Sequence, residues 1–207
     1  MDIPPVPAKK MSLPVRIIVV VCGLVAMAGG IAQCKKGVSE IREASGGGEM
    51  KQVLAEIEAA VEAGNKSGLE AQPMFQKLLN DVDSLGLAKV RQQQKDVAQK
   101  VADLFGQSAE QFRLAAKKST EAAAQEPREK FKPFFTYKAQ AYEAYAQGRA
   151  INQEITRMVM DESIAKAADL IAKATAAGER RDAAQKTGDE AEARANAAAK
   201  AAKDSPK

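Results

Sequence analysis

Histidine and tryptophan are both missing from this chain of 207 residues. Without imidazole it can form neither a Ser-His-Asp nor a Cys-His catalytic arrangement, and it has no histidine metal ligand. The glycine run Gly46–Gly48 is followed by Glu49 and lacks the Lys-Ser/Thr pair of a phosphate-binding loop. Because the usual groups of acid–base catalysis are missing, we expect no enzyme, no catalytic residue, no cofactor and no metal site.

Cysteine and net charge are also scarce. The chain has two cysteines, Cys22 and Cys34, so the part from Lys35 onward can form no internal disulfide. Its 31 basic residues nearly balance its 27 acidic residues, which leaves a formal charge of +4. A nucleic-acid-binding protein usually concentrates basic residues on one face, so this balance argues against nucleic acid as a partner.

Long apolar runs are limited to one stretch near the N-terminus. Residues 17–32 contain no polar side chain, and the wider stretch 15–34 reaches the roughly 20 residues that a helix needs to cross a bilayer. We therefore expect 15–34 to be a single-pass membrane anchor or a signal segment. The large apolar side chains that would face lipid include Ile17, Val20, Leu24, Val25 and Ile31.

The end of this stretch carries a second signal. The sequence Ile31-Ala32-Gln33-Cys34 resembles the cleavage box of bacterial lipoproteins. The resemblance implies that Cys34 would be lipidated and that the residues before it would be removed. Because Gln33 stands where that box has a small residue, we favour the uncleaved anchor, with ordinary signal cleavage or a buried soluble helix as further alternatives. Basic residues before the apolar run favour export of the C-terminal region to the periplasm or cell surface.

Beyond the anchor, apolar residues recur with a helical period and without strand-like alternation. The pattern predicts helices at 49–63, at about 72–85, at 87–125 and at 128–177, separated at Gly64-Asn65, Gly86 and Glu126-Pro127. The predicted fold class is all-α: an N-terminal transmembrane or signal helix, then an up-and-down bundle with a long coiled-coil-like hairpin. The predicted organisation is a flexible tail (1–14), the anchor (15–34), a linker (35–48), the helical bundle domain (49–177) and an Ala/Lys-rich tail (178–207).

Aromatic residues are concentrated in one short segment. One hypothesis is that they form the packed end of the bundle, and the other is that they form a ligand or partner patch. The residues are Phe131, Phe134, Phe135, Tyr137, Tyr142 and Tyr145.

Two functions follow from these features. The first is a membrane-tethered structural or interaction protein that binds protein partners, or a second copy of itself, through coiled-coil surfaces and needs no small-molecule ligand. The alternative is a lipoprotein whose bundle binds a small molecule at the aromatic segment.

Overall fold

The computed structural model describes residues 41, 48–126 and 128–204. The described residues from 48 to 204 form five α-helices and one short 3-10 helix and contain no strand, so the all-helical prediction is confirmed for this part of the chain. The predicted anchor, including Cys34, lies outside the described residues. Within the described part, no helix combines the length and apolarity needed to cross a membrane. The elements are α3 (Gly48–Leu85), α4 (Leu87–Gln93), α5 (Lys95–Gln125), η2 (Glu129–Phe131), α6 (Lys132–Met160) and α7 (Ala167–Asp204).

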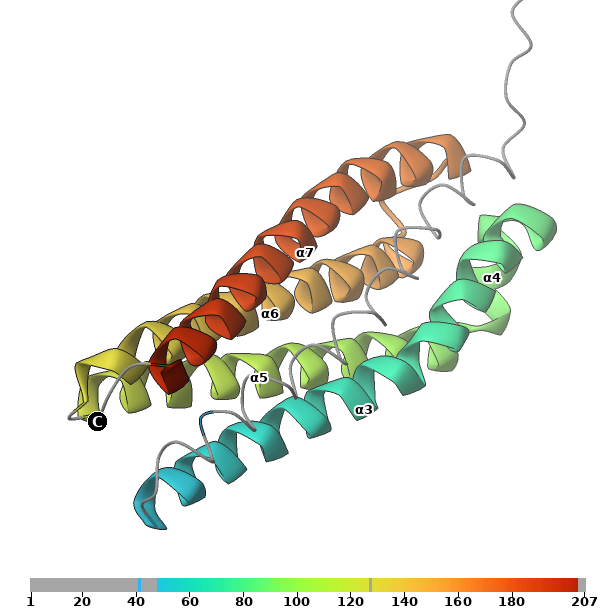
Figure 1. Ribbon diagram of the computed structural model, residues 1–207. Coiled ribbons are helices and arrows are strands. Elements are labelled where there is room, and N and C mark those ends of the chain that lie inside the picture. The colour runs from blue at the N-terminus through green and yellow to red at the C-terminus, as the bar shows by residue number, and fades with distance from the viewer. Residues whose placement is uncertain (1–40, 42–47, 127, 205–207) are drawn as a thin grey trace, which may run out of the picture.

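The long helices pack in a bundle in which α5 contacts both α3 and α6, and α6 contacts α7. Short connections reverse the chain between α5 and α6 and between α6 and α7, so these neighbours run antiparallel (Figure 1). Helix α6 therefore lies between α5 and α7, with α3 on the far side of α5 (Figure 1).

The predicted break at Gly64-Asn65 was wrong, because α3 continues through it and also through Pro73. Gly64 instead lies where α3 packs closely against α5, because a Cβ at this position would lie 3.2 Å from the ring of Phe112. Its carbonyl oxygen also accepts a hydrogen bond of 2.7 Å from Ser108 Oγ. The helix ends at Gly86, as predicted, where φ is 85°, a conformation that glycine adopts without steric penalty.

The two long predicted helices are each divided in the structure. The predicted helix 87–125 is interrupted at Gln94, where α4 gives way to α5. The predicted helix 128–177 ends at Met160, and α7 begins only at Ala167. Arg91 stabilises this second break by donating hydrogen bonds to the main-chain oxygens of Val159 (2.8 Å), Asp161 (2.5 Å) and Ile164 (2.9 Å). The guanidinium thus binds main-chain oxygens both at the end of α6 and in the connection that follows it.

The expected tail at 178–207 differs most from the structure, since α7 continues to Asp204 and packs against α6. At Gly188 an added Cβ would lie only 2.5 Å from Cε1 of Tyr145, which shows how closely the two helices approach. Small side chains permit this approach, so α7 can pack beyond Leu170 and Ile171 without large apolar residues. The buried positions of α7 follow a helical period of three or four residues, and most of them are alanine or glycine: Ala174, Ala177, Gly178, Ala184, Gly188, Ala191, Ala195, Ala199 and Ala202.

The bundle interior contains two apolar clusters. One includes Phe112 and Tyr142, and the other includes Phe75 and Phe105. Along each long helix, glycine and polar residues separate the two clusters. We call these separating residues the polar layer; it comprises Gly64 and Gly68 of α3, Gly106 and Ser108 of α5, Gly148, Arg149 and Asn152 of α6, and Gly178, Arg181 and Gln185 of α7.

Candidate functional site

The predicted aromatic residues lie mostly inside the bundle. Phe131, Phe134, Phe135, Tyr142 and Tyr145 are buried, and Tyr137 is partly buried.

The aromatic rings form a packed core with a residue from α5. Phe134 and Phe135 meet edge to face with ring centroids 5.1 Å apart. Phe112 lies 5.9 Å from the ring of Tyr145 and 6.4 Å from that of Tyr142. Such contacts are typical of structural packing, because aromatic side chains dominate burial in small cores.

A buried ion pair lies beside these rings and was not predicted from the sequence. Lys138 Nζ of α6 donates a hydrogen bond to Glu192 Oε1 of α7, and both side chains are only 1% exposed. The ammonium group also lies 5.6 Å from the ring centroid of Phe134 and 5.7 Å from that of Tyr142. Removing either member would leave an uncompensated charge in the interior. The pair thus links α6 to α7 in a region where the small side chains of α7 bury little apolar surface.

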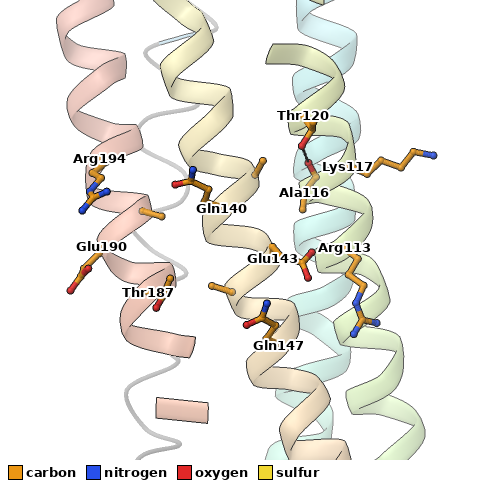
Figure 2. A pocket seen from close by; sticks show the side chains of 13 residues that line it. Arg113, Ala116, Lys117, Thr120, Gln140, Glu143, Gln147, Thr187, Glu190 and Arg194 are labelled. Carbon is orange, nitrogen blue, oxygen red and sulfur yellow. Dashed lines mark hydrogen bonds between the residues drawn. The ribbon is translucent and has the colours of Figure 1, made fainter. Parts of the chain in front are cut away.

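A surface groove follows α6 between α5 and α7. Its two adjoining parts have volumes of about 610 Å³ and 530 Å³ and share Arg113, Gln147 and Thr187. In Figure 2, Gln147 belongs to the central helix, Arg113 to one wall and Thr187 to the other. The remaining lining is dominated by alanine: Ala116, Ala139, Ala144, Ala150, Ala183, Ala184 and Ala191. The groove is therefore long, is lined mostly by short side chains and is bounded by three helices.

The charged rim of the groove is mainly cationic. Its cations are Arg113 and Lys117 of α5 and Arg180 and Arg194 of α7, against the carboxylates Glu143 and Glu190.

Two of these four cations already have ion-pair partners. Arg180 pairs with Glu154 at 2.8 Å, and Lys117 pairs with Glu121 at 3.8 Å. Arg113 and Arg194 are exposed on opposite walls, and neither forms a hydrogen bond or ion pair with another described residue. Each wall of the groove thus carries one cation without an ion-pair partner among the described residues (Figure 2).

None of the six predicted aromatic residues lines this groove. Sequence reasoning missed the groove because it depends on which helix faces remain uncovered after packing. The described residues contain no group of three His, Cys, Asp or Glu side chains that could hold a metal ion. Comparisons with known protein families, with curated proteins and with solved structures find no match.

Proposed function

We propose that this chain is an interaction protein, held at a membrane by residues 15–34, that binds an acidic amphipathic helix of a protein partner. The helix would lie in the groove over α6. The observation that carries the proposal is the combination of an alanine-lined groove with the uncompensated cations Arg113 and Arg194 on its two walls.

The shape of the groove favours a helix over an extended peptide or a compact ligand. It follows the axis of α6 and is walled by two helices antiparallel to α6, so a further helix could pack against all three. Helix axes pack about 8–10 Å apart, and small residues at the contact favour the shorter separations. No strand edge is exposed among residues 48–126 and 128–204 to pair with an extended segment.

The charges of the groove specify the partner further. Carboxylates flanking the apolar stripe of the bound helix could pair with Arg113 on one side and Arg194 on the other. Cationic flanks would instead meet these arginines and Lys117 at close range. Complementary charge of this kind mainly sets specificity and association rate.

The test is a binding titration of the full-length chain in detergent micelles with a designed fluorescent helix. The helix carries an Ala/Leu stripe flanked by Glu, and its matched control carries Lys in place of Glu. We expect the Glu helix to bind and the Lys helix to bind at least about tenfold more weakly, which corresponds to roughly 1.4 kcal/mol spread over two arginines. The double variant Arg113→Glu/Arg194→Glu should reverse this preference.

Arg157→Glu supplies the control, because Arg157 is an exposed arginine of α6 that does not line the groove. Arg157→Glu changes the net charge by as much as either groove substitution does alone. It should leave the preference for the Glu helix intact. Equal binding of both peptides, or equal effects of the groove and control variants, would refute the proposal. A dimer in sedimentation that Gln147→Trp converts to a monomer would identify a second copy as the occupant and would also contradict it.

A further inference from the structure

Arg149 is a buried cation that has no counter-ion among the described residues. It is 5% exposed, and it forms no hydrogen bond or ion pair with another residue that the structure describes. Burial lowers the pKa of Arg149 to about 10, so the guanidinium remains protonated at neutral pH. A buried charge of this kind is strongly unfavourable unless an opposite charge or several hydrogen bonds compensate it.

The neighbouring Asn152 is also unsatisfied. It follows Arg149 by three residues on α6, which places the two side chains on the same face of the helix. Asn152 is 0% exposed, and within the described part of the chain neither Nδ2 nor Oδ1 has a hydrogen-bond partner. Buried amides in folded proteins are nearly always hydrogen-bonded, so both ends of this amide are available to a polar ligand.

Glycine makes room for this pair. A Cβ added to Gly68 of α3 would lie 2.7 Å from Cζ of Arg149 and within about 3 Å of both terminal nitrogens, so the guanidinium rests against the α3 backbone. Any side chain at position 68 would displace it. The arrangement belongs to the polar layer, where all four long helices replace large apolar residues with glycine or polar ones.

We infer that Arg149 and Asn152 form a binding site for a small oxyanion, a carboxylate or a tetrahedral anion, inside the bundle at the polar layer. The guanidinium supplies the positive charge and paired N–H donors, which match the oxygen atoms of such anions. The amide of Asn152 supplies a further N–H donor. Ligand sites in helical bundles are commonly built this way, from side chains that face the space between helices.

The experiment follows thermal unfolding of the full-length chain in micelles by circular dichroism at 222 nm. Sodium phosphate, sulfate and acetate are compared with chloride at constant ionic strength. At about a hundredfold excess over Kd, bound anion should raise the Tm by about 5 °C or more. A response to acetate alone identifies a carboxylate site, and a response to phosphate and sulfate identifies a site for tetrahedral anions.

The decisive variant is Gly68→Ala. Its methyl group collides with the flexible end of Arg149, so the chain should fold while the anion response is lost. Gly106→Ala is the matched control, because its Cβ would meet only the end of the Gln153 side chain, at 2.5 Å. It should retain the response. Arg149→Met should lose the response without loss of stability in chloride, since it removes an uncompensated charge.

Three outcomes would overturn the inference. The first is the absence of any anion-dependent rise, which means that water alone satisfies these groups. The second is an equal rise in the wild type and Gly68→Ala, which places the anion elsewhere. The third is loss of the response in Gly106→Ala as well, which makes it a general consequence of helix packing.

Discussion

Gly188 offers a direct test of how α7 packs. Replacing glycine by alanine within a helix normally stabilises it by about 1 kcal/mol. At Gly188, however, the new Cβ would lie 2.5 Å from Cε1, 2.7 Å from Cδ1 and 3.1 Å from Cζ of Tyr145. Overpacking of this kind costs about 1–3 kcal/mol. The ring would also have to move away from Asp189, whose Oδ1 accepts a hydrogen bond of 3.0 Å from Tyr145 Oη, at a further cost of about 1 kcal/mol.

Gly188→Ala should therefore lower the free energy of unfolding by about 1–3 kcal/mol, measured by urea denaturation with circular dichroism. Gly148→Ala is the matched control on α6. A Cβ there meets only Cγ of Arg181, at 4.0 Å, so the change should stabilise the chain by about 0.5–1 kcal/mol. If Gly188→Ala proved as stable as Gly148→Ala, the close packing of α7 on α6 would be refuted.

Two further predictions concern the ion pair and the anchor. Lys138→Met should destabilise the bundle by about 3–5 kcal/mol in urea unfolding, because it leaves the buried charge of Glu192 unpaired. Adding Glu192→Leu should restore most of the lost stability. A Lys138→Met variant as stable as the wild type would contradict burial of the pair. For the anchor, we expect membrane-extracted chain to have its full-length mass and Cys34→Ser to remain membrane-associated; recovery of a chain that begins at lipidated Cys34 would instead establish the lipoprotein alternative.

Local sequence signals predicted helix type and some helix ends. Gly86 ends α3, and α5 ends at Gln125 before Glu126-Pro127, as expected. The signal at Gly64 failed because glycine serves both helix ends and helix crossings, and only the position of Phe112 on another helix distinguishes the two roles.

The larger error at α7 has a different physical cause. Hydrophobic periodicity depends on large apolar residues, whereas most residues that α7 buries are alanine or glycine. In an alanine-rich helix, the buried face and the exposed face have similar hydrophobicity, so a buried stripe of small residues is difficult to recognise in the sequence. Burial of Glu192 was missed for the same reason, since a charged residue among alanines suggests a solvent-exposed helix face. The polar layer could have been detected only by aligning the glycines of all four helices, which requires the helix pairing first.

The two proposed sites lie on different faces of α6, and this separation makes them independently testable. Gln147 lines the groove, while Arg149, two residues later, is buried and reaches Gly68 of α3. Two residues along an α-helix correspond to a rotation of about 200°, so these side chains point in nearly opposite directions. A helix bound in the groove would therefore cover Gln147 and Arg113 without contacting the guanidinium of Arg149. Absence of peptide binding together with an intact anion response would reject the groove proposal alone. Peptide binding without an anion response would reject the anion site alone.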